Sequence, residues 1–316
     1  QVTSLAFVFP GQGSQAVGML SAMGDRCPIV KDTFTEASDQ LEFDLWQMAQ
    51  SDSAETLALT ENTQPLVLTA SIALFRLWQQ RGGRDPAVAA GHSLGEFSAL
   101  VAADSLGFGD AVRLVRLRGQ AMQAAVPVGE GAMAAVIGLE DELINQACAQ
   151  ITEDSGQPVL AVNFNSPGQV VIAGMAGSVA LAAEALKAGG AKRVLPLPVS
   201  APFHTPLMQH AADVIGEELS TMSIGTPKWP VMSNVNGEPQ TNPEEIRRLL
   251  VEQVVAPVRW TACMSAMLAM GCRQFVECGP GRVLSGLTRR INRDAMGYGL
   301  ETPDQFESTL AELAQE

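Results

Sequence analysis

The sequence has few histidines, few aromatic residues and little positive charge. Its 316 residues include 3 histidines, and 20 lysines and arginines stand against 34 acidic residues, which gives a formal net charge of -14. Sequence-independent nucleic-acid binding needs a basic surface, so we exclude nucleic acid as a partner. An acidic protein could still bind at a local basic patch. With only 5% aromatic residues, the core must be filled mainly by alanine, valine, leucine and methionine.

The cysteines and apolar runs show no pattern typical of a metal site, a disulfide framework or a membrane span. The sequence has an odd number of cysteines, and none are in Cys-x-x-Cys spacing: Cys27, Cys148, Cys263, Cys272 and Cys278. This favours reduced thiols in a cytoplasmic protein. No apolar run reaches the roughly 18–20 residues that a membrane span needs. The first residues lack a basic segment followed by a long apolar one, so we expect no signal peptide.

The first part of the chain alternates short apolar strands with helices. Residues 5–9 and 87–90 are apolar runs that end in glycine-rich loops. Residues 28–50, 63–80 and 110–125 have the periodicity of helices. This alternation predicts a parallel sheet that is covered on both faces by helices.

After residues 126–129 the order of the predicted elements changes. Strands are expected at 131–139, 159–164, 169–173 and 193–197, and helices at 141–151 and 177–188. The order β-α-β-β-α-β is that of a ferredoxin-like unit. We therefore predict a large α/β subdomain made of residues 1–127 and 199–316, with a small subdomain of residues 128–198 inserted in it.

The remaining segments continue the large subdomain. Helices are expected at 213–221, 243–254 and 261–270, strands at 231–233 and 275–277, and an acidic helix or frayed tail at 302–316. The strand at 275–277 is expected to be the last one.

Residues 91–95, Gly-His-Ser-Leu-Gly, contain a Gly-x-Ser-x-Gly motif between a predicted strand and a predicted helix. A nucleophile elbow requires this context, because the two glycines allow the strand to turn sharply into the helix. Ser93 would then lie at a helix N-terminus, with the Leu94 N–H free to bind an oxyanion. The alternative is a structural turn without a catalytic role.

A serine nucleophile needs a base, and the chain offers His92, His204 and His210. Neighbouring side chains leave a strand in opposite directions, so His92 is expected to line a pocket rather than to act on Ser93. His210 falls in a predicted helix and is expected at the surface. His204 lies in a proline-bracketed loop, where catalytic residues often occur. The alternative for His204 is a loop histidine that is hydrogen-bonded to the backbone. No aspartate is evident as the third member of a catalytic triad.

Helical periodicity places Arg118 on the core side of its helix, whereas Arg113 and Arg116 fall on the opposite, solvated face. Its neighbours on the core side are Ala111, Leu114, Val115, Ala121 and Met122. A buried guanidinium needs an anionic partner, because an unpaired buried charge costs several kcal/mol. That partner would be a carboxylate of the protein or a carboxylate of the substrate, which the arginine fork binds in bidentate fashion. The second case indicates an acyl group with its own carboxylate.

A second glycine-rich turn, FPGQGSQ at residues 9–15, follows the first predicted strand. It lacks the Gly-Lys-Ser/Thr of a P-loop, and by itself it is either a phosphate-binding loop or a plain turn. In an acyl-transfer enzyme it would supply a second backbone N–H, that of Gln12, opposite that of Leu94.

These segments together resemble the malonyl-CoA:acyl carrier protein transacylase family of bacterial fatty-acid synthesis. The resemblance rests on eight segments in order over nearly the whole chain: FVFPGQGSQ, GHSLGE, RLRGQAMQ, GAMAAVIGL, VNFNSPGQVVIAG, LPLPVSAPFHTPLM, VAPVRW and VECGPGRVLSGL. It implies an α/β hydrolase-like core with a mainly parallel sheet and an inserted ferredoxin-like subdomain. It also implies an enzyme without a metal or a bound cofactor.

Matched segment by segment, the resemblance implies a role for each site residue. Ser93 would be the acyl nucleophile, His204 its base, and the amides of Gln12 and Leu94 the oxyanion hole. Gln253 would orient His204 through its backbone carbonyl, which would explain the absent triad acid. The substrate would be bound by Arg118, at the malonyl carboxylate, and by His92, Met122, Asn163, Asn165 and Phe203.

The implied reaction moves a malonyl group from coenzyme A to the phosphopantetheine thiol of acyl carrier protein, by a ping-pong mechanism through malonyl-Ser93. We expect a cytoplasmic monomer with malonyl-CoA and acyl carrier protein as partners and no membrane contact. Because the carrier protein is acidic, docking requires a local basic patch. The candidates are Lys192, Arg193, Arg289 and Arg290. A serine thioesterase or esterase on the same elbow, and a non-catalytic carrier-protein-binding module, are the alternatives.

Overall fold

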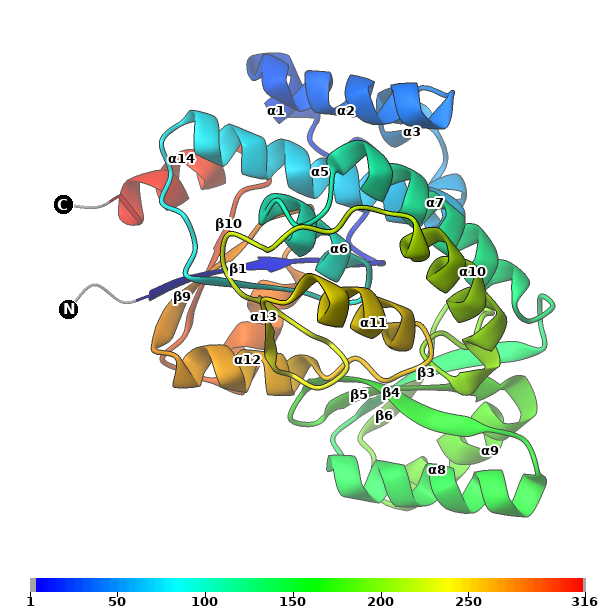
Figure 1. The fold of residues 1–316 in the computed structure, drawn as a ribbon. Helices are drawn as coiled ribbons and strands as arrows, with labels where there is room; N and C mark the ends of the chain where they lie inside the picture. Colours follow the sequence, from blue (N-terminus) through cyan, green and yellow to red (C-terminus); the bar gives the residue numbers. More distant parts are fainter. Residues whose placement is uncertain (1–3, 315–316) are drawn as a thin grey trace.

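The computed structural model describes residues 4–314 as helices and strands grouped around two sheets (Figure 1). The strands are β1 (Ser4–Phe9), β2 (Val88–Gly91), β3 (Gly131–Ile137), β4 (Val159–Ser166), β5 (Gln169–Met175), β6 (Arg193–Pro196), β7 (Val231–Met232), β8 (Pro239–Gln240), β9 (Cys272–Glu277) and β10 (Met296–Gly299). The helices are α1 (Ser21–Arg26), α2 (Pro28–Leu41), α3 (Leu45–Ser51), α4 (Ala54–Ala58), α5 (Thr60–Gln80), α6 (Leu94–Ala102), α7 (Phe108–Ala124), α8 (Asp141–Ser155), α9 (Ala176–Ala188), α10 (Gln209–Ser220), α11 (Pro243–Gln253), α12 (Trp260–Ala269), α13 (Val283–Ile291) and α14 (Pro303–Glu312).

The larger sheet has the strand order β10-β9-β1-β2-β7-β8. Neighbouring strands from β10 to β7 pair in parallel, and β8 turns back to pair with β7 in antiparallel fashion. The prediction of an α/β fold with a mainly parallel sheet is therefore confirmed. Because parallel strands end at the same edge, the loops after β1 and β2 meet there.

Strand β1 is buried on both faces, as its continuous apolar run predicts. Alternate side chains point to opposite faces, so Phe7 packs on α5 while Ala6 and Val8 pack with α12 and α13. The Phe7 ring makes edge contacts with Phe75 and Trp78, with centroids 5.7 and 5.5 Å apart. Full burial of one such side chain stabilises the fold by about 1.5–3 kcal/mol.

The smaller sheet is antiparallel throughout, in the order β4-β5-β3-β6, with α8 and α9 packed on one face (Figure 1, green). With α8 between β3 and β4, and α9 between β5 and β6, it has the predicted β-α-β-β-α-β order. Its other face contributes Met133, Val162 and Val171 to the core of the larger sheet. The exact subdomain boundaries at residues 128 and 198 stay a prediction.

The two sheets are joined by hydrogen bonds between β4 and the segment before α12. The N–H of Val258 donates to the carbonyl of Val162 at 2.7 Å, and the N–H of Phe164 donates to the carbonyl of Val258 at 3.0 Å. The Thr261 hydroxyl donates to the carbonyl of Phe164 at 3.0 Å. These bonds attach the end of β4 to α12 and the segment before it, and α12 shares a buried core with Ala6 and Val8 of β1.

Two predictions about single elements were wrong. The helix predicted at 28–50 is two helices, because Glu42 adopts a left-handed φ of 65° and Asp44 caps α3 by accepting the Gln47 N–H. The strand at 275–277 is not the last one, since β10 follows and pairs with β9. The signal of β10 in the sequence is weak because two of its four residues, Gly297 and Gly299, are glycines.

The short elements α1, α4 and β8 had no counterpart among the predictions. The predicted helix at 302–316 corresponds to α14, and residues 315–316 lie outside the described part of the chain. All five cysteines are free thiols, as expected. Within residues 4–314, no helix combines the length and apolar character that crossing a membrane requires.

We expect Gly95→Ala to destabilise the fold although alanine favours helices. A Cβ at position 95 would lie 2.0 Å from the carbonyl oxygen of Phe9, so β1 and the start of α6 would have to separate, at about 1–3 kcal/mol. The matched control is Gly286→Ala in α13, where a Cβ meets nothing within 4 Å and should stabilise by about 0.5–1 kcal/mol. Urea unfolding of both variants measures the change in the free energy of unfolding. Changes of the same sign in the two variants would contradict this prediction.

Candidate active site

Ser93 lies in the turn between β2 and α6, in a backbone conformation that few residues adopt. Its φ is 53° and its ψ is -108°, which lies outside the allowed regions for L-residues. Gly91 and Gly95 make this turn possible, because a Cβ on Gly91 would lie 1.9 Å from the carbonyl group of Gly95. The turn therefore has the tight strand-to-helix geometry of a nucleophile elbow.

Asn234 holds this elbow from the side of β7. Its Nδ2 donates to the carbonyl of Gly91 at 2.7 Å, and its Oδ1 accepts the Ser93 N–H at 2.8 Å. A residue of a neighbouring parallel strand would bond these same two backbone groups, so the side-chain amide takes the place of a strand residue. On the other edge, the N–H of His92 donates to the carbonyl of Phe9 at 3.0 Å.

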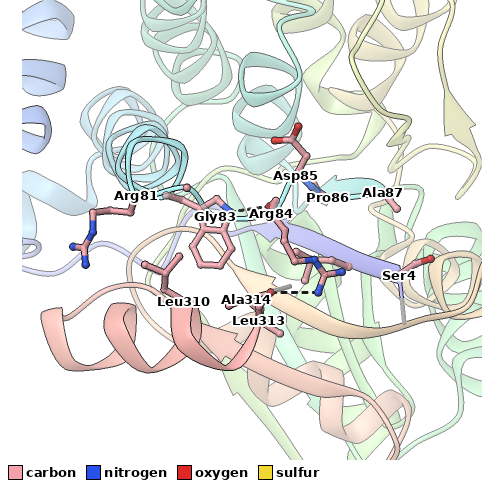
Figure 2. A pocket seen from close by; sticks show the side chains of 13 residues that line it. Ser4, Arg81, Gly83, Arg84, Asp85, Pro86, Ala87, Leu310, Leu313 and Ala314 are labelled. Atoms are coloured by element: carbon pink, nitrogen blue, oxygen red, sulfur yellow. Dashed lines mark hydrogen bonds between the residues drawn. The ribbon is translucent and has the colours of Figure 1, made fainter. Parts of the chain in front are cut away.

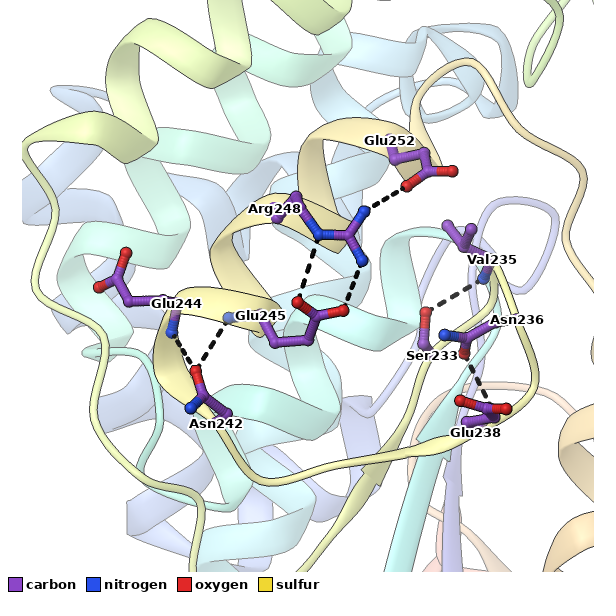
Figure 3. Close-up of polar contacts among 9 residues, drawn as sticks. All are labelled: Ser233, Val235, Asn236, Glu238, Asn242, Glu244, Glu245, Arg248 and Glu252. Carbon is purple, nitrogen blue, oxygen red and sulfur yellow. Dashed lines mark hydrogen bonds and ion pairs between the residues drawn. The ribbon is translucent and has the colours of Figure 1, made fainter.

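The hairpin turn that carries Asn234 and the helix that ends at Gln253 are each fixed by local side-chain hydrogen bonds (Figure 3). In the turn, Asn236 accepts the N–H of Glu238 at 3.0 Å. At the start of α11, Asn242 accepts two N–H groups of the first turn, at 2.9 and 3.1 Å. The amides of Gln253 and Asn234 then meet, with Nε2 and Oδ1 3.4 Å apart.

His204 is within hydrogen-bond distance of Ser93. Its Nε2 lies 2.7 Å from the Ser93 Oγ, and its Nδ1 lies 2.9 Å from the backbone carbonyl oxygen of Gln253. Because a carbonyl only accepts, Nδ1 carries the proton and Nε2 accepts the serine hydroxyl. The structure thus brings together the predicted nucleophile, base and orienting carbonyl, with a neutral oxygen where a triad has a carboxylate.

The imidazole of His204 is held in its neutral form. The side chain is only 3% exposed. Burial, together with the positive charge of Arg118, lowers the pKa of His204 from 6.5 to about 3. At neutral pH the ring is therefore free to accept a proton, as a general base must.

Arg118 extends from α7 into the site and is 1% exposed. Its Nη1 donates to the Gln64 Oε1 at 2.9 Å, and its Nη2 donates to the Gln253 Oε1 at 2.8 Å and to the Ser93 Oγ at 3.3 Å. Its Nε–H has no partner among residues 4–314. The prediction that Arg118 points inward holds, but its direct partners are neutral oxygens rather than a carboxylate of the protein.

The acid that faces Arg118 is Glu96, in the first turn of α6. Glu96 is fully buried, and one carboxylate oxygen accepts the Asn234 N–H at 2.7 Å while the other has no partner within residues 4–314. Burial raises the pKa of Glu96 to about 8, against the opposing effects of the Asn234 N–H and the Arg118 charge. Burial therefore opposes ionisation of Glu96, and no ion pair joins Glu96 to Arg118 within residues 4–314.

The amides of Gln12 and Leu94 border the same cavity as Ser93. The first N–H groups of a helix have no partner within the helix, which leaves the Leu94 N–H available. The loop after β1 lies against the elbow, since a Cβ on Gly11 would lie 2.4 Å from the carbonyl oxygen of His92. The assignment of the Gln12 and Leu94 amides as an oxyanion hole stays a prediction from the resemblance.

The cavity at Ser93 has a volume of about 120 Å³. Both sheets contribute to its wall, because Met133 and Leu197 reach it from the smaller sheet. It is also lined by His92, Arg118, Met122, Asn163 and Phe203, five of the six predicted substrate-binding residues. The sixth, Asn165, is not among the residues that line it, and its Oδ1 accepts a hydrogen bond from the His92 Nε2–H at 2.7 Å instead.

His92 is engaged away from the nucleophile. Beside its bond to Asn165, its ring lies over Trp260, with the centroids 5.6 Å apart. Burial lowers the pKa of His92 and the bond to Asn165 opposes this effect. His210 is exposed on α10. Of the three histidines, only His204 contacts Ser93.

The four predicted docking residues lie away from the cavity, on the surface. They are Lys192, Arg193, Arg289 and Arg290, all exposed. In the smaller sheet, Ile137 pairs with Arg193 on one side and with Gln169 on the other. The Arg290 Nη1 donates to the Gln169 Oε1 at 3.2 Å. Residues far apart in the sequence therefore meet at one edge of the sheet.

A larger hollow of about 780 Å³ lies at the opposite end of β1 and β2 (Figure 2). It is lined by the loop before β2 and the end of α14, and none of the described residues that line it is a histidine or a cysteine. Arg81 forms an ion pair with Glu307 at 2.6 Å, and Arg84 donates to the carbonyl of Leu313 at 3.4 Å. Without a nucleophile–base pair, it is not the catalytic site.

Three buried polar residues of the site had no prediction from the sequence: Gln64, Glu96 and Asn234. Glu96 had a usable signal, because it is the one charged residue in the apolar helix α6. Asn234 is 141 residues from Ser93 along the chain, and Gln64 is 54 from Arg118. No spacing or periodicity connects partners at such separations.

Comparison with known proteins gives the family. Residues 6–296 match the acyl transferase domain family. The chain belongs to this family. One relative, the malonyl CoA-acyl carrier protein transacylase of Escherichia coli K12, is 53% identical over 309 residues, which is 98% of this chain and 99% of the relative.

Solved structures of other acyl transferases share the whole fold. An acyl carrier protein S-malonyltransferase from Vibrio cholerae is 49% identical with a TM-score of 0.95, over 97% of this chain and 100% of that one. A malonyl-transacylase in complex with a type II PKS acyl-carrier protein is 47% identical with a TM-score of 0.96, over 98% and 100%. The hydrolase-like core with an inserted antiparallel sheet is therefore the fold of this acyl transferase.

We expect acylation of Ser93 in this acyl transferase to stay fast in mild acid. The pKa of His204 is lowered, so the ring stays neutral as the pH falls through 6.5 and charges only towards about 3. Stopped-flow acylation by a neutral active ester, from about pH 8 to about pH 4, should show no loss near the ordinary imidazole pKa of about 6.5. Arg118→Gln should move the acid limb upward, because the positive charge that helps to lower the pKa is removed. If the acylation rate of the wild type instead fell near pH 6.5, the lowered pKa of His204 would be contradicted.

Proposed function

We propose that the chain transfers a malonyl group from coenzyme A to the phosphopantetheine thiol of acyl carrier protein, through a malonyl ester on Ser93. The observation that carries this proposal is the position of Arg118, whose Nη2 lies 3.3 Å from the Ser93 Oγ. A buried guanidinium with an unpartnered Nε–H beside the nucleophile favours an acyl group that ends in a carboxylate. The names of the relatives support the same substrates.

In the first half-reaction Ser93 is acylated. His204 accepts the hydroxyl proton at Nε2 while the Ser93 Oγ attacks the malonyl thioester carbonyl. The oxyanion of the tetrahedral intermediate accepts hydrogen bonds from the N–H groups of Gln12 and Leu94, each worth about 2.7–4 kcal/mol in comparable sites. When the carbon–sulfur bond breaks, the imidazolium returns its proton to the sulfur, coenzyme A leaves as a thiol, and malonyl-Ser93 remains.

In the second half-reaction the acyl group moves to the carrier protein. His204, neutral again, accepts the proton of the phosphopantetheine thiol, and the sulfur attacks the malonyl-Ser93 carbonyl. The same two amides stabilise the oxyanion. The ester bond then breaks, the proton passes from the imidazolium to the Ser93 oxygen, and the free enzyme returns. This two-step scheme is ping-pong, with Arg118 bound to the malonyl carboxylate in both steps.

Hydrolysis on the same elbow would use Ser93 and His204 in the same way, with water as the acceptor. An esterase has no need for an inward arginine, and the neutral carbonyl of Gln253 takes the place of a triad acid. Both features favour transfer of an acidic acyl group over hydrolysis. A cytoplasmic monomer that needs no bound cofactor or metal stays a prediction from the sequence.

Intact-mass spectrometry tests the proposal directly. After incubation with malonyl-CoA we expect one malonyl adduct, located on Ser93, that is stable in buffer and is discharged by holo acyl carrier protein. Ser93→Ala, which lacks the nucleophilic oxygen, should form no adduct. Rapid loss of the adduct without carrier protein would indicate a hydrolase, and no adduct on the wild type would indicate a binding module.

In the same assay, Arg118→Ala separates the acyl groups. Removing the guanidinium should lower malonyl transfer and leave acetyl transfer relatively improved, because only the malonyl group has a carboxylate. A buried charge–carboxylate interaction is worth about 3–5 kcal/mol when one partner is removed. Equal losses for malonyl and acetyl groups would count against this role of Arg118.

We also propose that the carrier protein docks on the basic edge formed by Lys192, Arg193, Arg289 and Arg290. Strand β6 leads from this edge towards the cavity, and Leu197, just after it, lines the cavity. At about 3.3 Å per residue, the four residues from Arg193 to Leu197 span about 13 Å. A phosphopantetheine arm entering from this edge would therefore reach Ser93. Glu140 and Asp141 line the same surface hollow as Lys192 and lower the local positive charge, so the arginines are expected to contribute most.

Charge reversal tests this docking surface. In the pair Arg289→Glu/Arg290→Glu we expect the discharge of malonyl-Ser93 by carrier protein to slow about tenfold at low salt, since charges at an interface rim act mainly on association. Acylation by malonyl-CoA should change much less. Lys31→Glu/Arg113→Glu, on exposed parts of α2 and α7, makes the same change in net charge and should leave discharge unaffected. Equal discharge rates in the two double variants would remove Arg289 and Arg290 from the proposed surface, and the same result for Lys192→Glu/Arg193→Glu would remove the surface altogether.

A further inference from the structure

Two glutamines hold the guanidinium of Arg118 at its two terminal nitrogens. Gln64 reaches Nη1 from α5, and Gln253 reaches Nη2 from the end of α11, at 2.9 and 2.8 Å between nitrogen and oxygen. Both glutamines are buried, at 2% and 0% exposure. Each presents its amide oxygen to the arginine, so the guanidinium is fixed in position by neutral acceptors.

A carboxylate would be the stronger partner for a buried guanidinium, because charged hydrogen bonds are stronger than neutral ones. A protein carboxylate in this position would, however, occupy the charge that a substrate carboxylate needs. Glu96 is the acid that faces Arg118, and it makes no ion pair with it within residues 4–314. Its raised pKa favours the uncharged form. Within residues 4–314, Arg118 therefore has no carboxylate in direct contact, and the centroid of the Phe97 ring lies 5.2 Å from its guanidinium carbon.

We propose that Gln64 and Gln253 are positioning residues that preserve selection of an acidic acyl group, because their neutral amide oxygens bond Arg118 without cancelling its charge. The guanidinium keeps its full charge and its unpartnered Nε–H for the carboxylate of the acyl group. This inference rests on the proposed function, in which that group is malonyl. In this inference, Gln64 and Gln253 support the selection of an acidic acyl group without touching the atoms that react.

The two glutamines differ in what else they contact. Gln253 also donates from Nε2 to the Ser93 carbonyl at 3.0 Å, and its backbone carbonyl accepts from His204. Within residues 4–314, the Gln64 side chain has one other hydrogen bond, from its Nε2 to the Met122 sulfur at 3.8 Å. Gln64 also lines the cavity at Ser93, but it bonds neither Ser93 nor His204, so a change there leaves the nucleophile and base in place.

The position of Gln64 is set by close packing of α5 against α7. A Cβ on Gly119, the residue after Arg118, would lie 2.6 Å from the carbonyl oxygen of Thr60. Pro65 leaves the carbonyl of Glu61 without an N–H donor in α5, and this carbonyl accepts a hydrogen bond from Arg116 at 3.0 Å instead. The first turn of α5, just before Gln64, is thus held against α7.

The test compares Gln64→Glu, which keeps the shape and adds a charge, with Gln64→Met, which is of similar length and neutral. The readout is the ratio of kcat/KM for malonyl-CoA to that for acetyl-CoA, with holo acyl carrier protein as acceptor. We expect the ratio to fall by about tenfold or more in Gln64→Glu, because the new carboxylate neutralises Arg118. In Gln64→Met we expect it to change by less than about threefold, since only a neutral hydrogen bond is lost.

Gln80→Glu, the same substitution on the exposed end of α5, is the control and should leave the ratio unchanged. Gln253→Glu provides a second variant with the backbone carbonyl intact, and its ratio should fall in the same direction. If Gln64→Glu and Gln64→Met lower the ratio equally, or if Gln64→Glu keeps the wild-type ratio, the inference is overturned. A wild-type chain that does not transfer malonyl would overturn the proposed function itself, so the two failures are distinguishable.

Discussion

The hydrogen bond from the Nδ1–H of His204 to the backbone carbonyl of Gln253 is the contact on which the rest of the site depends. It fixes the tautomer, so that Nε2 faces Ser93 as an acceptor. A carbonyl does not stabilise an imidazolium as a carboxylate does, and burial beside Arg118 therefore lowers the pKa of the base to about 3. The side chain of the same Gln253 bonds Arg118 and the Ser93 carbonyl. One residue thus ties together the base, the nucleophile and the cation.

The site uses neutral acceptors where charged ones would be stronger. His204 is oriented by a carbonyl, Arg118 by two glutamine oxygens, and the Ser93 turn by the amide of Asn234. The chain has a large excess of carboxylates, yet the acid buried here, Glu96, favours its uncharged form. The positive charge of Arg118 consequently remains for an incoming anion. The same neutrality leaves His204 able to accept a proton and, in the proposed function, leaves Arg118 to select an acidic acyl group.

Backbone strain shows how much of the site depends on tertiary contacts. Ser93 and His204 both have positive φ, of 53° and 64°, and residues in such conformations cost about 1–3 kcal/mol each. They persist because the surrounding structure holds them: Asn234 bonds the Ser93 turn, and Gln253 bonds His204. The supports come from the β7–β8 turn and the end of α11, far along the chain from β2. Neither residue could keep its conformation on local preferences alone.

By itself the sequence determined the features whose signals are local. The alternation of elements predicted the parallel sheet, the glycines around Ser93 predicted the turn, and helical periodicity predicted the inward side of Arg118. The short, glycine-containing β10 escaped prediction because pairing with β9, not its own composition, makes it a strand. Only the tertiary structure decided that Arg118 meets Gln64 and Gln253 instead of a carboxylate. Hydrogen bonds between such distant residues arise when packed helices and strands bring them within about 3 Å, and no local pattern encodes that approach.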